Sequence, residues 1–480
     1  MTQAPSHTLW TARDAVKATN GTTKGDWFAT GVSIDTRTLK EGDLFIAIKG
    51  DHSDGHAYVQ AALDKGAAAI VVDHIPENIP AEKILLVTDT LKAMQDLARF
   101  ARARTAAKII GITGSVGKTG TKEMLGLALS QYGVTHWSQK SYNNHWGVPL
   151  SLSRMAAGSD FAVFEMGMNH HNEITPLSMQ VQPHIAIITT IAPVHIEHFP
   201  EGIDGIAYAK SEIFNGMDEH GIAVINHDIA QHKILKDQAN KKGIKKIFSF
   251  GEGEGADARL LSIITASNGV RAEADILGEK ISFQLRDAGK HQAVNALAVL
   301  LSLKLAGLEL APAIKALQAI EPPAGRGKRE FINIGDEHNP VTLIDKSYNA
   351  SPVAMQAAFK VLALIDPGRG GRRVAILGDM LELGADSARL HAELALPLRA
   401  ANVDLVYTCG AMMKNLHDAL PANQKKVHKN TSLELAEIVP DVLVPGDVVM
   451  IKGSLGSKMA SVVEALRQLP VKRKSANDRG

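Results

Sequence analysis

The stretch GITGSVGKTGTKE, residues 111–123, contains the side chains best suited to chemistry. Its glycines let backbone N–H groups turn towards an anion, and the start of a following helix adds positive potential. Lys118 can reach the β- and γ-phosphate oxygens of a nucleotide, and the Thr119 hydroxyl can ligate Mg²⁺. The stretch therefore predicts a loop that binds ATP and Mg²⁺, formed by Thr113, Gly114, Ser115, Val116, Gly117, Lys118, Thr119 and Gly120.

The loop departs from the strict pattern GxxxxGK[ST], because Ile112 stands where the first glycine is required. A nucleotide-hydrolysing site also needs an acidic metal partner, and the apolar run FAVFEMG places Glu165 at the end of a predicted strand. The guanine-reading string Asn-Lys-x-Asp is absent, which disfavours a GTP switch. At this point a motor, a kinase and an activating ligase stay open, as does a glycine-rich turn with an incidental lysine.

The elements that must position these residues alternate between short apolar runs and helical patterns. This alternation predicts an α/β fold with largely parallel sheets. The 480 residues divide into three blocks, 1–105, 106–320 and 321–480, each long enough for a domain. The break EPPAGRGKRE, residues 321–330, is expected to be a linker, and the last block is expected to form a second doubly wound sheet.

Each block offers its own strands. The first has DLFIAIKG, AAAIVVD and KILLVTD, and the last has VTLID, RRVAILGD, VDLVYTCG and DVVMIKGS. The middle block has KIIGIT, FAVFEMG, HIAIITT and IAVIN, then shorter strands over 257–286 and a helix over 290–306.

Charge and composition exclude several classes of protein. Lys and Arg number 52 against 51 Asp and Glu, a balance that argues against a protein built around nucleic-acid phosphates. The single cysteine, Cys409, allows no intrachain disulfide. We find neither a signal-peptide pattern nor an apolar stretch of 18 residues, so we expect a cytoplasmic protein without a membrane span. A monomer is the expected state.

Two further residues acquire meaning only beside the loop. The run IAPVHIEHF places His195 after a strand, and AYAKSEIF places Lys210 in a predicted helix. Alone, they would be a core or capping histidine and a surface lysine. Together with the loop they resemble the Mur ligase family of bacterial cell-wall synthesis. The matching residues are Gly117-Lys118-Thr119, Asn143-Asn144-x-x-Gly147-x-Pro149, Glu165-x-Gly167, His195 and Lys210-x-Glu212-Ile213.

The resemblance continues towards the C-terminus. GKHQAVNALAVL resembles the family's adenine-side motif, PPAGRGKRE its linker arginine, and DKSYNASPVAM its third-domain motif. It implies that Asn143, Asn144, His291, Asn295, Arg326, Asp345 and Asn349 contribute to ATP binding. The chain departs from the family at Lys140-Ser141, where Gly-Asn is common, and at Lys346 and Ser351.

The resemblance implies a fold and a reaction. The fold is the three-domain architecture, with a central P-loop ATPase-like domain and a C-terminal Rossmann-like domain that binds the incoming amine. The reaction is ATP-dependent amide formation through an acyl phosphate. Lys118, Glu165, His195 and Lys210 would be catalytic, and Mg²⁺ would be held by Thr119, Glu165, His195 and a carbamylated Lys210.

The substrates follow from finer similarities. LGDMLELG and KGSLGSKM resemble the member that adds D-alanyl-D-alanine to UDP-N-acetylmuramoyl tripeptide, and the first block resembles its UDP-sugar domain. There, Ser33, Asp35, Thr36 and Arg37 follow a short strand and are candidates to contact uracil or diphosphate, with a simple polar turn as the alternative. A Mur-type ligase that adds a single amino acid is the nearest alternative. A regulatory module without turnover and a P-loop kinase are more distant ones.

Overall fold

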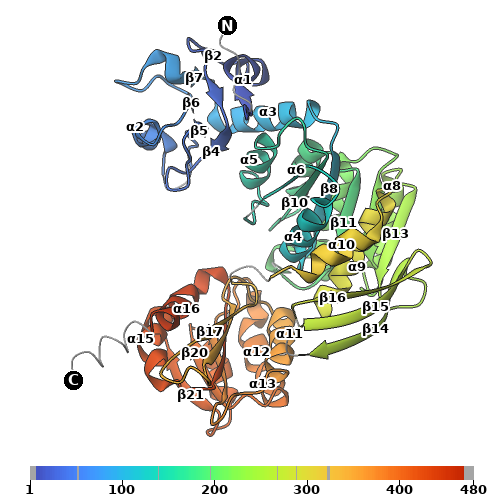
Figure 1. The fold of residues 1–480 in the computed structure, drawn as a ribbon, viewed down its shortest axis with the longest axis vertical. Coiled ribbons are helices and arrows are strands. Elements are labelled where there is room, and N and C mark those ends of the chain that lie inside the picture. The colour runs from blue at the N-terminus through green and yellow to red at the C-terminus, as the bar shows by residue number, and fades with distance from the viewer. Residues whose placement is uncertain are drawn as a thin grey trace.

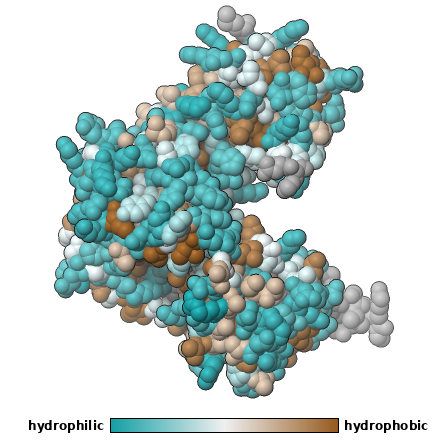
Figure 2. All heavy atoms as spheres, turned by 180° about the vertical axis from the view of Figure 1, so that it is seen from behind, coloured by the Kyte–Doolittle hydropathy of each residue, from teal (hydrophilic) through white to brown (hydrophobic). Residues whose placement is uncertain are grey.

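The computed structural model describes residues 7–50, 53–138, 140–194, 196–266, 269–287, 289–321 and 325–469. Its described part contains three sheets of five, nine and six strands, each in its own unit (Figure 1). The middle unit lies between the other two, and Figure 2 shows a wide opening between the first and the third. None of the helices in the described part of the chain is both long and apolar enough to cross a bilayer.

The first unit is built on a sheet with the strand order β2-β7-β6-β5-β4, of which only β2 is antiparallel. A separate two-stranded ladder pairs β1 with β3. The parallel strands β5 and β6 are buried on both faces, which explains runs such as AIVV. The elements are β1 (Trp10–Thr11), α1 (Ala12–Thr19), β2 (Thr22–Thr23), β3 (Phe28–Ala29), β4 (Gly31–Ser33), β5 (Asp43–Ile46), the 3₁₀ turn η1 (Gly55–Tyr58), α2 (Val59–Asp64), β6 (Ala69–Val72), η2 (Ala81–Lys83), β7 (Ile84–Leu86) and α3 (Thr90–Ala103).

The first unit is joined to the middle unit by packed surface as well as by the chain. Helix α3 packs against α5 (Gly147–Ser153) of the middle unit. The Trp10 indole donates to the carbonyl of Ser153 at 2.9 Å, and Arg154 Nε donates to the carbonyl of Val32 at 2.6 Å. These contacts fix the end of β4, where the predicted substrate residues begin.

The middle unit has the strand order β16-β15-β14-β13-β12-β11-β8-β10-β9. Strands β8 to β14 run parallel where they pair, and β14, β15 and β16 form an antiparallel extension. The predicted parallel core is therefore confirmed. The strands are β8 (Lys108–Thr113), β9 (Thr135–Trp137), β10 (Phe161–Glu165), β11 (Ile185–Ile188), β12 (Ile222–Asn226), β13 (Lys246–Gly251), β14 (Ala258–Ala266), β15 (Gly269–Ile276) and β16 (Glu279–Leu285).

Two apolar clusters cover the two faces of this sheet, because successive residues of a strand point to opposite sides. Ile110 of β8 belongs to the cluster formed with α4, α9 and α10, and Ile109 belongs to the cluster with α5, α6, α7 and α8. The helices are α4 (Lys118–Leu129), α6 (Ile174–Val181), α7 (Ile203–Ser211), α8 (His232–Lys241), α9 (Lys290–Leu305) and α10 (Leu310–Gln318), with 3₁₀ turns η3 (Ile196–His198) and η4 (Glu212–Gly216).

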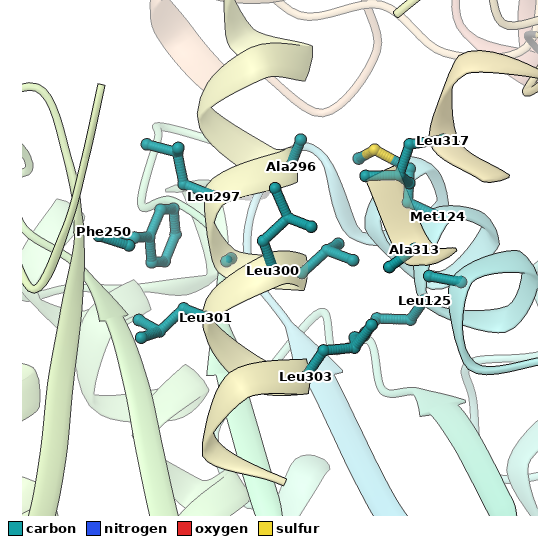
Figure 3. Packing of buried hydrophobic residues seen from close by; sticks show 14 of the residues in the cluster. Met124, Leu125, Phe250, Ala296, Leu297, Leu300, Leu301, Leu303, Ala313 and Leu317 are labelled. Atoms are coloured by element: carbon teal, nitrogen blue, oxygen red, sulfur yellow. The ribbon is translucent and has the colours of Figure 1, made fainter. Parts of the chain in front are cut away.

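Helix α9 is apolar around most of its circumference. Figure 3 shows Leu297 and Leu301 directed towards Phe250 of β13, while Leu303 points towards α4. Apart from its first turn, it is buried almost continuously from Ala293 to Leu303, as an all-round apolar helix must be. This helix fixes the distance between the sheet and α4, which follows the glycine-rich loop.

The third unit has the strand order β17-β18-β22-β19-β20-β21, and only the edge strand β17 is antiparallel. Helices cover both faces, so the predicted doubly wound sheet is confirmed. The elements are β17 (Lys328–Ile332), β18 (Val341–Lys346), α11 (Pro352–Ala363), β19 (Arg373–Gly378), η5 (Gly384–Asp386), α12 (Ser387–Ala392), α13 (Ala395–Ala400), β20 (Leu405–Cys409), α14 (Met413–Ala419), β21 (Lys425–Lys429), α15 (Ser432–Val442), β22 (Val448–Lys452), η6 (Leu455–Ser457) and α16 (Ala460–Arg467).

The predicted linker over 321–330 is too long at its C-terminal end. Strand β17 begins at Lys328 and pairs with β18, so the last three residues belong to the third sheet. The charges in KRE suggested a loop, but an edge strand tolerates charged side chains. Residues 322–324 lie outside the described residues.

Candidate active site

The glycine-rich loop connects the end of β8 to the start of α4, as the sequence predicts. Gly114 and Gly117 have φ values of 147° and 94°, in the region that favours glycine. A Cβ on Gly114 would lie 2.0 Å from Thr189 Oγ1, and one on Gly117 would lie 2.8 Å from Asn295 Nδ2. Both glycines are therefore required by conformation and by close approach.

Serine and lysine side chains hold the loop in this shape. Ser115 Oγ donates to the carbonyl of Ala192 and accepts from its N–H, both at 3.0 Å. Lys118 Nζ donates to the carbonyl of Gly114 at 2.7 Å. Burial lowers the pKa of Lys118, the charge of Arg326 acts in the same direction, and the charge of Glu165 opposes both. The lysine therefore lies within electrostatic reach of a carboxylate and of the linker arginine.

Glu165 is the centre of a buried hydrogen-bond network at the end of β10. Its side chain is almost completely buried, and Thr119 Oγ1 donates to its Oε2 at 2.9 Å. Ser141 Oγ and Asn143 Nδ2 donate to its Oε1, at 2.9 Å and 2.8 Å. A hydroxyl and a carboxylate side by side are hard oxygen ligands, so Thr119 and Glu165 fit a magnesium ion.

Lys210 reaches the same region from α7, in the helix that the sequence predicts. It is 3% exposed. Burial first, and the positive charge of Lys118 second, hold its pKa well below the usual range. Lys210 thus lies close enough to Lys118 to be affected by its charge. The fourth predicted catalytic residue, His195, lies outside the described residues.

The adenine-side residues lie on the first turns of α9. Asn295 is buried and adjoins Gly117, and Gln292 adjoins Gly120. His291, on the first turn, is exposed. Asn295 is thus in contact with the loop, whereas the role of His291 stays a prediction.

Two of the predicted ATP-binding residues form hydrogen bonds that shape the neighbouring backbone. Asn144 Oδ1 accepts from the N–H of Gly147 at 2.8 Å and so caps the start of α5. Asp345 accepts from the N–H of Gly325 at 3.0 Å and from Ser347 Oγ at 2.7 Å, and so shapes the end of the linker. Neither contact involves the glycine-rich loop.

The linker arginine and the third unit form a second cationic region. The guanidinium of Arg326 stacks over Tyr348, 4.4 Å from the ring centroid. Lys452 Nζ donates to the carbonyl of Asn349 at 2.6 Å. Burial, followed by the charges of Lys346 and Arg326, lowers the pKa of Lys452 to about 7. Arg326 is therefore close to both the loop lysine and Lys452.

The predicted substrate residues form a turn after β4 in the first unit. Asp35 pairs with Arg37 at 2.7 Å, and Ser33 Oγ donates to the carbonyl of Asp35 at 3.1 Å. The carbonyl of Thr36 accepts a hydrogen bond from the side chain of the lysine at the C-cap of α2. The hydrogen bond from Arg37 lowers the pKa of Asp35 most, and Lys140 of the middle unit contributes in the same direction. This turn therefore faces the segment that leads to Ser141.

Sequence reasoning missed Ser141, Gln292 and Thr189, which contact Glu165 or the loop. Ser141 was noted only as a departure from the family pattern. Ser141 could have been suspected from the sequence because it is polar and lies two residues before Asn143, a predicted binding residue. The sequence does not show, however, in which direction its side chain points.

Comparisons with known proteins agree with this geometry. The profile described as "Mur ligase middle domain" matches residues 112–303, "Mur ligase family, catalytic domain" matches 29–102, and "Mur ligase, glutamate ligase domain" matches 331–455. A UDP-N-acetylmuramoyl-tripeptide–D-alanyl-D-alanine ligase from Rickettsia prowazekii is 37% identical over 435 residues, 90% of this chain and 94% of the relative.

The chain belongs to the Mur ligase family.

Other relatives of this Mur ligase have the same description. The ligase of that name from Escherichia coli is 33% identical, with 94% of this chain and 96% of the relative covered. A crystal structure of MurF from Acinetobacter baumannii superposes with a TM-score of 0.82, at 28% identity, over 96% of this chain and 99% of that one. A MurF ligase from Thermotoga maritima, solved in complex with ADP, has a TM-score of 0.74 at 26% identity, over 92% and 98% of the two chains.

Proposed function

We propose that this Mur ligase joins D-alanyl-D-alanine to UDP-N-acetylmuramoyl tripeptide in peptidoglycan precursor synthesis, with conversion of ATP to ADP and phosphate. One observation carries the chemical part: Thr119 of the phosphate loop is hydrogen-bonded to the buried Glu165, and the buried Lys210 lies within electrostatic reach of the loop lysine, Lys118. The choice of substrates rests on relatives of that name that match over at least 90% of the chain.

A free carboxylate resists attack by an amine, because its leaving group would be oxide. One carboxylate oxygen of the tripeptide therefore attacks the γ-phosphorus of ATP, the bond to the β-γ bridging oxygen breaks, and ADP leaves. The dipeptide amine then attacks the acyl carbon, and the tetrahedral adduct collapses with loss of phosphate and a proton. The product is the new amide.

The first step brings two anions together, so neutralisation of charge is a large part of catalysis. We propose that Lys118 turns from the Gly114 carbonyl to the terminal phosphates when nucleotide binds. Backbone N–H groups of Val116 to Thr119 would complete the cradle, as expected at a helix N-terminus. Arg326, which is within electrostatic reach of Lys118, would add charge from the linker.

We propose that Thr119, Glu165, His195 and Lys210 hold magnesium. When bound, the metal would screen the phosphates and orient the attacking carboxylate. Glu165 already accepts three hydrogen bonds that fix its direction, which pre-organises the ligand.

We propose that Lys210 is carbamylated. An ammonium would repel magnesium, whereas a carbamate is an anionic oxygen ligand. Carbamate forms when a neutral amine attacks CO₂ and loses a proton. The low pKa of Lys210, caused by burial and by Lys118, leaves the amine neutral more often than an exposed lysine.

The activity is tested by phosphate release with each substrate omitted in turn. We expect release only when ATP, the UDP-linked tripeptide and D-alanyl-D-alanine are all present. Release with single amino acids in place of the dipeptide would favour the related amino-acid-adding ligase.

We further propose that the enzyme acts in the cytoplasm as a monomer, and sedimentation at assay concentration tests the oligomeric state.

A further inference from the structure

A cluster of metal-ligating side chains lies outside the proposed active site, in the first unit. Among the described residues, His56, Asp73 and His74 form a group in which one ligand atom from each lies within 4.8 Å of the others. His56 belongs to η1, while Asp73 and His74 directly follow β6. The proposed ligase chemistry uses none of them.

Contacts on both sides of the ring hold His56 in place. Its Nδ1 is 2.6 Å from Asp54 Oδ1, and Asp54 also accepts from the His56 backbone N–H at 3.0 Å. These contacts place Nδ1 towards the Asp54 carboxylate and Nε2 towards Asp73. Nε2 accepts from the backbone N–H of Asp73 at 3.3 Å, a long hydrogen bond that a bound metal ion would replace.

The lone pair of Nε2 faces further acceptors. Asp73 Oδ1 is 3.2 Å from His56 Nε2 and 2.5 Å from His74 Nδ1. The two imidazole rings stack with centroids 4.4 Å apart and an interplanar angle of 25°. The carboxylate oxygen of Asp73 thus lies beside one nitrogen of each ring, an arrangement that a shared cation would stabilise.

We propose that His56, Asp73 and His74 bind a divalent transition-metal ion of the zinc class, with Asp54 as the carboxylate that orients His56. Two imidazoles and one carboxylate are a frequent zinc ligand set, and the histidine donates its other N–H to a carboxylate, as metal-bound histidines usually do. Tetrahedral zinc with bonds of about 2.0–2.1 Å separates ligand atoms by about 3.3 Å. The His56–Asp73 pair already has nearly this spacing. The exposed His74 must rotate out of its stack on His56 before its lone pair can reach the same ion.

The three proposed ligands differ in solvent exposure, which leaves the site accessible to a metal ion from solution. The His56 side chain is 8% exposed, Asp73 34% and His74 62%. The buried member is held by η1, and the exposed members leave room for solvent to complete the coordination. Bound metal would tie η1 to the end of β6, at the carboxyl edge of the sheet that also presents the Ser33–Arg37 turn.

The test uses the full-length protein, stripped of metal with a chelator and titrated with Co²⁺ in excess Mg²⁺. Magnesium occupies sites made of oxygen ligands and competes poorly for imidazole. We expect about one equivalent of Co²⁺ to bind with the intense visible absorption of four- or five-coordinate cobalt, and Zn²⁺ to displace it. Zn²⁺ should also raise the melting temperature, because it binds only the folded first unit.

His74→Gln should weaken Co²⁺ binding by at least about tenfold and abolish the Zn²⁺-dependent shift in melting temperature. Because His74 is on the surface, the variant should melt like the wild type without metal. His220→Gln is the matched control: His220 is 83% exposed beside Glu219, outside the cluster, and the change should leave Co²⁺ binding intact. Equal Co²⁺ binding by wild type and His74→Gln, or no visible spectrum in the wild type, would overturn the proposal. The cluster would then be a proton-bridged Asp54–His56–Asp73 arrangement.

Discussion

At the scale of single residues, the proposed chemistry depends on groups whose charge is set by burial. Glu165 is buried yet accepts three hydrogen bonds, while Lys210 is a buried lysine whose pKa is lowered by burial and by the charge of Lys118. Like charges in a buried site are costly unless an anion or a change of protonation compensates. ATP and a carbamate would supply that compensation.

Replacement of Glu165 by Gln keeps the shape of the side chain and removes its charge. We expect kcat to fall by at least about 100-fold and the apparent affinity for Mg²⁺ to weaken, because a metal ligand becomes neutral. Phosphate release measured against Mg²⁺ concentration checks this. Ser141→Ala removes one donor to the same carboxylate and should have a much smaller effect; equal losses in the two variants would contradict the assignment.

Replacement of Lys210 by Ala removes the proposed carbamate. We expect most activity to disappear and to return in part when short-chain carboxylic acids are added, since they can occupy the vacated space as oxygen ligands. The measurement is phosphate release with and without added acid. A fully active Lys210→Ala enzyme would show that the carbamate is not needed.

At the scale of elements, the strand-loop-helix unit β8–α4 positions the phosphate-binding groups. Its glycines are fixed by two different constraints, conformation and contact with Asn295 or Thr189. A substitution at Gly117 should therefore act on nucleotide binding and not only on stability.

Gly117→Ala forces a Cβ against Asn295 in a left-handed conformation. We expect a higher KM for ATP and a stability loss of roughly 1–3 kcal/mol. Gly243→Ala is the control, because Gly243 also has a positive φ of 80° but a Cβ there would meet nothing within 4 Å. If both variants keep the wild-type KM for ATP, the close approach at Gly117 has no role in binding.

Lys452, at the end of β22, should make stability depend on pH. Its pKa is about 7 in the folded chain and about 10.4 when unfolded. Between these values unfolding takes up a proton, so stability rises with pH from about 7 to 10; below 7 both states are protonated and the burial cost is fully present. Lys452→Met should remove this rise and be more stable than the wild type at pH 6. Urea denaturation at several pH values checks the difference.

Sequence patterns predicted the buried elements better than the edges. β8, β10, β11 and β12 are continuous apolar runs, and all four are strands. β9, β17 and β21 lie at sheet edges and carry polar residues, as in KKVHK, so their short-range pattern resembles a loop. Lys118 and Thr119 were predicted because a motif fixes their spacing, and Glu165 because it ends an apolar run. Ser141 and Gln292 act through contacts that only the folded chain creates. The block boundaries at 105 and 320 stay predictions.

At the scale of the whole molecule, the two outer units are attached differently. Packed helices and two long-range hydrogen bonds join the first unit to the middle one. The third unit follows a segment that contains Arg326, whose charge reaches Lys118 and Lys452. We therefore expect large-scale motion mainly in the third unit, as closure over a reactive acyl phosphate would require.

Arg154→Ala removes the hydrogen bond to the carbonyl of Val32. Hydrogen bonds to charged groups contribute about 1.5–3 kcal/mol, so backbone exchange around Ser33–Arg37 should become at least about tenfold faster. Hydrogen-exchange mass spectrometry checks this, with segments of the third unit as the internal control. Unchanged exchange at Ser33–Arg37 would show that α3–α5 packing and the Trp10–Ser153 hydrogen bond hold the junction without Arg154.

Helix α9 has a consequence for inhibitor design. Asn295 adjoins the loop, yet the helix that carries it is enclosed by the core from Ala293 to Leu303. A compound that wedges against Asn295 would press on the hydrophobic interior, where loss of one large side chain costs about 2–5 kcal/mol. Resistance mutations in the buried part of this helix, Ala293 to Leu303, would therefore endanger folding, which favours compounds that contact Asn295.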